Sequence, residues 1–523
     1  MEPTQTAEPD QSIEIRPTDR RLATVLLLCA AGLLIVICMV RAAVSWRHDA
    51  NIDHVSGVWF TMSQDLLDGV FYRPISGPLG YGGTRYMPLF FVMHAGLWKA
   101  LGSWRIAGHA IAAASVVALV VGVYVFLRRL EVSRAFAFGA AGVFLAGVGG
   151  KYALLDMRAD GLAAALSLWG VVVSASGFAV DVRDDAITRT GVGPAKHASR
   201  NTTLAAVLFT LAFAAKVTTV FGVAAVVLWL WFNAQRRLAV WLAGGTAMRY
   251  LAVIALTDHF SSGRFLQILR ATAAGGGSKS FAFSAPLRIA DELTMSAPDA
   301  VLLVLACAVL LAAGRRVWRT LPAILFITTL AVTLVIFGSP GTVGNHLVDL
   351  EVACAVVIVA NIASKPLWRD LARYALAGTM VLATLHYWQE FEDTDTDNMH
   401  ASYTEIEDAV RATGKPVLTE QPLIAIEAGQ RPYVLDPFMF RVFAARDPRI
   451  AQPLWDKLDA KAFGAVVLEY DPRTGEGTYV YDSVHFGPPF RQHLTANYEF
   501  VKQVGDLFVW KPKGAAFPTM EDQ

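Results

Sequence analysis

The segment Trp46-Arg-His-Asp-Ala-Asn-Ile-Asp53-His54-Val-Ser-Gly follows the first long apolar run of the chain, which extends from Leu22 to Val40. The chain then continues through polar residues to Gly80-Tyr-Gly-Gly-Thr-Arg85-Tyr86-Met-Pro88. Residues 46–86 are too polar and too rich in Gly and Pro to cross a bilayer, yet their aromatic side chains suit a membrane–water interface. We therefore interpret residues 46–86 as a long loop at one face of a membrane.

The composition supports this interpretation. Of the 523 residues, 54% are hydrophobic and only 17% are charged, and the mean hydropathy is +0.43. These values are too apolar for a soluble globular protein and typical of a multi-span membrane protein. The formal net charge of +1 indicates no nucleic-acid partner. The four cysteines lie inside apolar runs and predict neither disulfides nor a metal site: Cys29, Cys38, Cys307 and Cys354.

Apolar runs alternate with short basic loops along most of the chain. If residues 87–102 do not cross the bilayer, the loops richest in Arg and Lys fall on the side of Arg20 and Arg21, which the positive-inside rule makes cytoplasmic. We therefore expect a juxtamembrane or re-entrant helix at 87–102, eleven spans, and a C-terminus on the opposite face. The first span is expected at 22–45, and the others at about 106–127, 135–150, 161–180, 202–215, 217–232, 238–257, 299–314, 320–337, 347–363 and 371–386.

The composition changes near Gln389, where an acidic stretch begins. Beyond it, residues 403–413 have a helical pattern, and Phe463–Glu469 is typical of a buried strand. The expected fold class is a polytopic α-helical membrane protein with a small C-terminal α/β extramembrane domain. Its expected parts are a disordered cytoplasmic tail (1–19), a transmembrane domain (20–388) and an outer domain (389–523).

The expected outer loops carry the candidates for a functional site. Asp53 is either a general base that accepts a proton from an acceptor hydroxyl, or an ordinary solvated loop acid. Arg73 and Arg85 lie in the same loop among tyrosines and glycines. A planar guanidinium suits phosphate oxygens, although arginines at an interface also meet lipid headgroups. Both alternatives stay open for each of these residues.

The next outer loops add further ionisable residues. Residues 151–160 contain Lys151, Asp156, Arg158 and Asp160 between uncharged helices, which is costly unless these side chains pair or line a cavity. Asp160 also stands where a carboxylate caps a helix. Lys216 interrupts an apolar stretch. A lysine within a membrane segment is either a functional residue or one whose side chain extends to the membrane–water interface. Asn345 and His346 follow a glycine-rich turn and suit sugar hydroxyls or a phosphate.

Taken in order, these motifs resemble the GT-C superfamily of polytopic glycosyltransferases. Within it, the chain is similar to the branch of protein O-mannosyltransferases, lipid A aminoarabinose transferases and bacterial core-oligosaccharide transferases. The resemblance covers residues 20–390, and Val417-Leu-Thr-Glu420 is similar to soluble tails of bacterial members. It rests on the loop with Asp53, on Arg85-Tyr-Met-Pro-Leu-Phe-Phe, Met157-Arg-Ala-Asp160-Gly, Lys216-Val-Thr-Thr and Gly344-Asn345-His346-Leu.

The resemblance implies an inverting transferase that uses a polyprenyl-phosphate sugar at the periplasmic face of the bacterial inner membrane. Its acceptor would be an envelope lipid, glycan or protein. Asp53 matches the first catalytic acid of the family, Asp160 or else Asp156 the second, and Lys216 and Arg85 match phosphate-binding positions. We add Arg73 and Arg158 as donor-phosphate ligands, and His54, Asp156, Asn345 and His346 as substrate-binding residues. The first loop has Asp53-His54 and no pair of acids, so no metal ligand is assigned and a divalent cation is left open.

Two other functions were weighed against transfer. A transporter or lipid flippase predicts internal repeats, broken helices and charges near the bilayer midplane. The polar residues of this chain instead cluster on one face, although Arg249 lies within an apolar run. A non-catalytic membrane scaffold would leave the acids of 46–86 and 151–160 without a shared task. Sugar transfer is therefore the preferred function.

Overall fold

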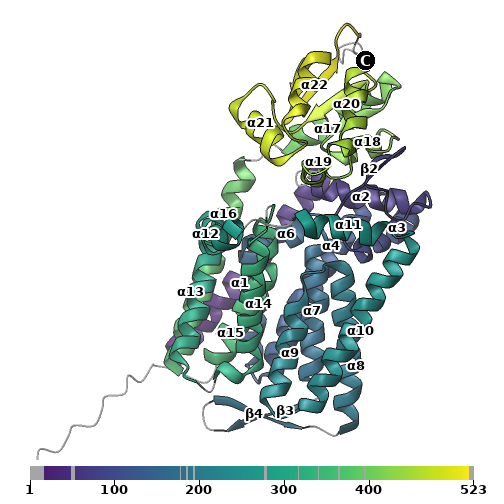
Figure 1. Cartoon of the computed structure of the whole chain (residues 1–523). Helices are drawn as coiled ribbons and strands as arrows, with labels where there is room; N and C mark the ends of the chain where they lie inside the picture. The colour runs from purple at the N-terminus through teal and green to yellow at the C-terminus, as the bar shows by residue number, and fades with distance from the viewer. Residues whose placement is uncertain are drawn as a thin grey trace, which may run out of the picture.

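The computed structural model describes residues 17–48, 54–176, 178–183, 186–192, 195–275, 279–315, 317–339, 341–362, 366–393 and 396–516. Long helices stand side by side in a bundle, and a mixed α/β unit covers one end of it (Figure 1). The hairpin of β3 (Phe178–Arg183) and β4 (Ala186–Val192) lies at the opposite end. We call the end next to the α/β unit the outer end of the bundle.

The bundle helices are apolar on their outward faces as well as inside. Leu311 and Val335 are 76% and 77% exposed, as expected of side chains that face lipid. The bundle contains α1 (Pro17–His48), α4 (Trp104–Arg129), α5 (Arg134–Ala141), α6 (Val148–Leu155), α7 (Ala159–Ala175), α8 (Ala195–Ala215), α9 (Val220–Phe232), α10 (Arg236–Phe260), α13 (Ala297–Ala312), α14 (Leu321–Phe337), α15 (Val348–Ile362) and α16 (Pro366–Asp393).

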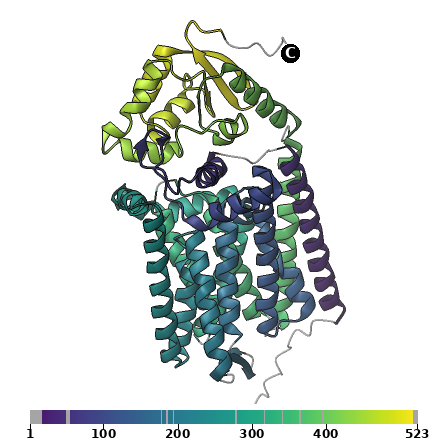
Figure 2. The same ribbon diagram turned by 90° about the vertical axis from the view of Figure 1, so that its right-hand side faces the viewer.

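Four helices among the described residues are long and apolar enough to cross a membrane: Arg21–His48, Trp104–Arg129, Arg236–Phe260 and Gly344–Ile362. Four shorter apolar helices accompany them: α7, α9, α13 and α14. These features indicate a multi-pass membrane protein, and the number of eleven spans stays a prediction. Residues 87–102 form α3 (Pro88–Leu101), which lies with α2 (His54–Leu67) in a layer of helices between the bundle and the α/β unit (Figures 1 and 2).

The segment expected as a span at 135–150 is bent: the chain turns by 83° between Ala146 and Val148, the geometry of a broken span or a re-entrant loop. The bend falls at Gly147, where a Cβ would lie 2.2 Å from Oδ1 of Asp299. The amides of Gly149 and Gly150 donate to the two carboxylate oxygens of Glu351, at 2.6 and 2.8 Å. Glu351 therefore caps the start of α6 from a remote part of the chain.

Two expected boundaries also shift. The helix α1 begins at Pro17, inside the expected tail, and residues 1–16 are outside the described part of the chain. Proline suits the first turn of a helix, since its missing N–H has no partner to lose there. The helix α16 continues past 389 to Asp393, because Glu390 is held by Lys151 at 2.6 Å and Arg41 at 2.5 Å.

The C-terminal α/β unit, residues 396–516, is built on a four-stranded sheet of order β5-β6-β8-β7, in which β5 and β6 are parallel and the other pairs are antiparallel. Both faces of β6 are buried, which explains the uninterrupted apolar sequence predicted as a strand. The strands are β5 (Val417–Thr419), β6 (Ala465–Leu468), β7 (Tyr498–Val504) and β8 (Leu507–Pro512). The helices are α17 (Thr396–Thr413), α18 (Pro422–Glu427), α19 (Pro437–Ala444), α20 (Gln452–Asp459), α21 (Gly475–Tyr479) and α22 (Pro489–Asn497).

The long outer loop is attached to this unit by main-chain hydrogen bonds. The loop contains the short strands β1 (Ser76–Gly77) and β2 (Gly80–Tyr81). In β2, the Tyr81 amide donates to the Tyr433 carbonyl at 2.8 Å. The Leu435 amide donates back to the Tyr81 carbonyl at 3.0 Å. Gly80 has a φ of 89°, and a Cβ there would lie 2.0 Å from the Tyr433 carbonyl oxygen. Glycine is required at this position because only its backbone adopts this conformation freely and approaches so closely.

We expect Gly80→Ala to lower the free energy of unfolding by more than about 1 kcal/mol, because alanine is strained at positive φ and its Cβ meets the Tyr433 carbonyl. Thermal unfolding of the full chain in detergent measures the effect. Gly244→Ala in α10 is the control, since no atom lies within 4 Å of its added Cβ. Equal unfolding temperatures of the two variants would contradict the attachment.

Candidate active site

A cluster of four polar residues forms at the outer end of the bundle. The ammonium of Lys216 pairs with Oδ1 of Asp160 and lies 2.8 Å from Nδ1 of His346. The side-chain amide of Asn345 donates to the same carboxylate oxygen at 2.9 Å. These residues come from three loops far apart in the sequence, and all four were predicted as site residues. The structure therefore brings together one acid, one lysine and two neutral hydrogen-bonding groups.

Each member sits at the end of an apolar helix. Lys216 follows the last turn of α8, where its amide donates to the Ala212 carbonyl at 2.9 Å, and its side chain is 15% exposed. Asp160 lies in the first turn of α7, but its carboxylate is engaged by the two side chains above. Asn345 and His346 lie in the single turn Gly344–Leu347 before α15. A lysine in such a low-dielectric position requires a fixed counter-charge, which Asp160 supplies.

Two predicted arginines lie beside this cluster, and both interact electrostatically with His346. Arg158 pairs with Asp156 at 2.9 Å and has its guanidinium 5.2 Å from the centre of the Tyr152 ring. The guanidinium of Arg85 is 5.3 Å from the centre of the Phe438 ring in the α/β unit. Lys216, Arg85 and Arg158 are thus three cations at this end of the bundle, two of them paired with the carboxylates of Asp160 and Asp156, and such groups suit an anionic ligand.

Arg73 does not join the cluster. Its side chain is fully buried and makes two hydrogen bonds to Asp65, at 2.5 and 2.9 Å, and a third to the Pro432 carbonyl at 2.7 Å. Arg431 approaches the same carboxylate at 3.2 Å. These contacts give Arg73 a structural task, the attachment of the long outer loop to the α/β unit, and its predicted phosphate contact gains no support from them. Asp53, the predicted general base, lies outside the described residues.

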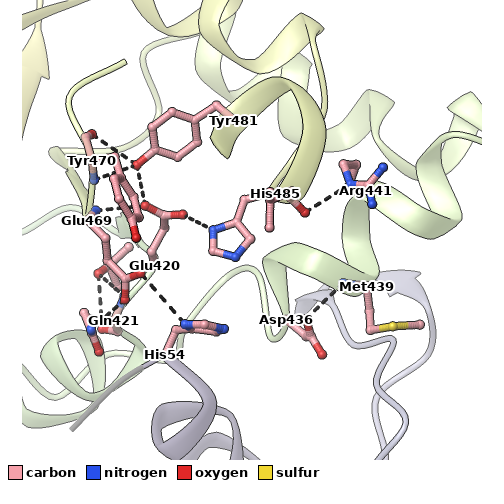
Figure 3. A network of polar contacts seen from close by, with 12 residues as sticks. His54, Glu420, Gln421, Asp436, Met439, Arg441, Glu469, Tyr470, Tyr481 and His485 are labelled. Carbon is pink, nitrogen blue, oxygen red and sulfur yellow. Dashed lines mark hydrogen bonds and ion pairs between the residues drawn. The ribbon is translucent and has the colours of Figure 1, made fainter. Parts of the chain in front are cut away.

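His54 is the first residue of α2 and lies against the α/β unit (Figure 3). Its Nδ1 is 3.8 Å from the carboxylate of Glu469, and its ring packs edge to face on His485 with centroids 5.1 Å apart. His485 in turn bonds through Nδ1 to the fully buried Glu420 at 2.6 Å, and the Tyr481 hydroxyl donates to Glu420 at 2.5 Å. Sequence reasoning missed these residues of the α/β unit.

Sequence reasoning also missed Arg288, in α12 (Lys279–Met295). Its guanidinium donates to the carbonyls of Phe337, Ser339 and Thr342, at 2.7, 3.0 and 3.0 Å. These carbonyls belong to the turn that leads to Asn345. A single planar guanidinium thus holds the shape of this turn. The only signal in the sequence is an arginine in an outer loop, and carbonyl partners cannot be identified from side-chain patterns.

The described residues contain no group of three His, Cys, Asp or Glu side chains placed to hold a metal ion.

No protein-family model and no curated protein sequence matches this chain significantly. Solved structures do match. The oligosaccharyltransferase of Archaeoglobus fulgidus in its apo form aligns over 96% of this chain and 76% of its own, with 12% identity and a TM-score of 0.54.

ArnT from Cupriavidus metallidurans in the apo state aligns over 92% of this chain and 98% of its own, with 14% identity and a TM-score of 0.54. The same protein bound to undecaprenyl phosphate aligns over 93% and 99%, with 12% identity and a TM-score of 0.55. This chain has the GT-C fold. The resemblance predicted from short motifs is thus confirmed at the level of the fold, over nearly the whole chain.

We expect Arg288→Gln to lower the free energy of unfolding by about 1–3 kcal/mol, because buried carbonyls lose their donor. Hydrogen exchange of residues 337–346 should also become faster. Both are measured on the full chain in detergent. Arg270→Gln is the control, since Arg270 is an exposed arginine of the neighbouring α11 (Arg264–Gly275). Exchange that is the same in both variants would contradict a role of Arg288 in holding the turn.

The environment of the Glu420 carboxyl indicates that the folded protein loses stability in acid. Burial raises the pKa of Glu420, but the hydrogen bond and charge of His485, together with hydrogen bonds from Tyr481 and the Glu469 amide, hold this pKa below its ordinary value of 4.5. The ionised form is therefore favoured by folding, and its stabilisation is present above pH 4.5 and lost as the pH falls through the lower folded pKa.

We expect the unfolding temperature of the wild type to fall steeply below pH 4.5, and that of Glu420→Gln to be lower at neutral pH and less dependent on acid. Glu476→Gln is the control, because Glu476 is exposed in α21. Parallel acid profiles for wild type and Glu420→Gln would show that this carboxylate is not the stabilising group.

Proposed function

We propose that this chain transfers a sugar from a polyprenyl-phosphate donor to an envelope lipid, glycan or protein acceptor at the outer, periplasmic side of the bacterial inner membrane. The observation that carries the proposal is Lys216, held by Asp160 and His346 at the outer end of a bundle with the GT-C fold. A related fold has been solved with undecaprenyl phosphate bound, in ArnT from Cupriavidus metallidurans. The α/β unit then lies on the acceptor side of the membrane.

The donor phosphate would be held by Lys216 and Arg85, with Arg158 as a further cation. In the reaction, an acceptor hydroxyl oxygen bonds to the anomeric carbon while the bond from that carbon to the phosphate oxygen breaks. The phosphate leaves with the bonding electrons, and the anomeric configuration inverts. Negative charge grows on the leaving oxygen, so cations already fixed in a low-dielectric site stabilise the transition state most. Asp160 and His346 keep Lys216 in place for this task.

The acceptor proton would pass to Asp53, the general base that the first outer loop offers. Asp53 directly precedes His54, the first residue of α2. Asn345, whose side-chain amide donates to Asp160, would orient substrate hydroxyls beside the cluster. Transfer is preferred to transport because Asp160, Lys216, Asn345 and His346 meet at one end of the bundle.

We expect Lys216→Gln to lower the turnover of sugar transfer by about 10²–10³-fold, the usual effect of removing one electrostatic stabiliser of a transition state. Transfer is measured in membranes with radiolabelled polyprenyl-phosphate sugars at matched expression. Lys99→Gln is the control, because Lys99 is an exposed lysine of α3. Loss of transfer in both lysine variants alike would contradict the phosphate site.

Asp53→Asn should also abolish transfer, and if it does not, the base would have to be Asp160.

A further inference from the structure

One short segment of the α/β unit contacts both acidic loops of the outer face. This segment consists of β5 and α18, residues 417–427, and we call it the β5–α18 segment. Its strand half ends beside Glu420, and its helix half lies directly on α2. The proposed function uses neither half. Three independent contacts indicate what the segment does.

The first contact is polar and reaches His54 (Figure 3). Glu420 is completely buried and accepts from Nδ1 of His485, from the Tyr481 hydroxyl and from the Glu469 amide at 2.9 Å. An ionised carboxylate only accepts, so Nδ1 of His485 carries its hydrogen and the imidazole is fixed in orientation. The His485 ring then packs against His54, which also lies 3.8 Å from the Glu469 carboxylate.

The second contact is steric and lies one helical turn further along α2. A Cβ on Gly57 would lie 2.5 Å from Cδ of Pro422, the first residue of α18. Real Cβ atoms do not approach other atoms so closely, hence α2 and α18 touch only because residue 57 has no side chain. Glycine is otherwise unfavourable inside a helix, by about 1 kcal/mol relative to alanine. Its presence here points to the close approach itself.

The third contact is apolar and reaches the loop before α7. Leu423 and Ile426 of α18 are buried against Phe60 of α2 and against Met157, which is fully buried. Met157 directly precedes Arg158 and stands three residues before Asp160. One small hydrophobic cluster thus joins α2, α18 and the residue that precedes Arg158, and fixes them relative to one another. A buried apolar cluster of this kind has one preferred packing, so it transmits position well.

We propose that the β5–α18 segment, with His485, positions the reaction centre by holding α2 of the first outer loop and the Asp156–Asp160 loop in register. Glu420, His485, Pro422 and Leu423 are positioning residues, since they act through His54, Gly57 and Met157. The α/β unit accordingly supports the reaction centre without touching substrate. The expected change in kcat rests on the proposed function. The expected change in hydrogen exchange does not, because it can be measured without any turnover.

The sharpest kinetic test compares Gly57→Ala with Gly96→Ala. Both replace a glycine in a helix of the outer layer, but no atom lies within 4 Å of a Cβ on Gly96. Alanine favours both helices intrinsically, so a defect limited to Gly57→Ala reports the contact with Pro422. We expect its kcat for transfer to fall by tenfold or more, with the donor KM within about twofold, because misplacement by 1 Å costs up to about 10²-fold in rate.

The structural test uses hydrogen exchange on the full chain, with Glu420→Gln against Tyr498→Phe. Tyr498 also makes buried hydrogen bonds in the α/β unit, to the main chain of Phe463, but none to α2. We expect faster exchange over residues 54–67 and 156–160 in Glu420→Gln only. Equal exchange in the two variants, or equal kcat in the two glycine variants, would overturn the proposal. Absence of transfer by the wild type would overturn the proposed function instead, and exchange would still decide the positioning role.

Discussion

The ion pair between Lys216 and Asp160 is the interaction on which the site depends. A lysine at the end of an apolar helix cannot keep its charge in a low-dielectric environment without a partner. Asp160 supplies this partner, and Asn345 and His346 satisfy the remaining hydrogen-bonding groups. The same contacts join the ends of α7 and α8 to the turn before α15. The need for a counter-charge beside this lysine therefore fixes the relative positions of three helix ends.

A second constraint acts on the outer loops, which have no lipid-facing helix to order them. They are ordered by the α/β unit, through the main-chain bonds of Tyr81, the buried pair of Arg73 and Asp65, and the packing of α18 on α2. Arg288 does the same for the turn before Asn345. Irregular backbone near a membrane needs partners for every amide and carbonyl, and here folded protein provides them. The site and its supports are consequently one structure.

Much of this arrangement follows from sequence patterns. Charge asymmetry between loops predicted that Asp160, Lys216, Asn345 and His346 share a face, and helix ends at that face then brought them into contact. The role of Arg73 was not predictable, because an arginine beside tyrosines and glycines looks the same whether its partner is a phosphate or Asp65. The bend at Gly147 was missed because Glu351, which caps it, is remote in sequence. No role was predicted for Glu420, which entered only through the resemblance of residues 417–420 to soluble tails, or for His485, which belongs to no recognisable motif.

The sequence by itself determined the class of the protein, the apolar helices, the polar face and four residues that meet there. Those properties follow from composition and from periodic patterns, which act locally along the chain. Only the tertiary structure decided which charges pair, where α6 is capped and how the α/β unit contacts α2. These pairings depend on distances between residues that are far apart in the sequence. The energy of an ion pair, or of close packing against a glycine, is gained only when folding brings those residues together.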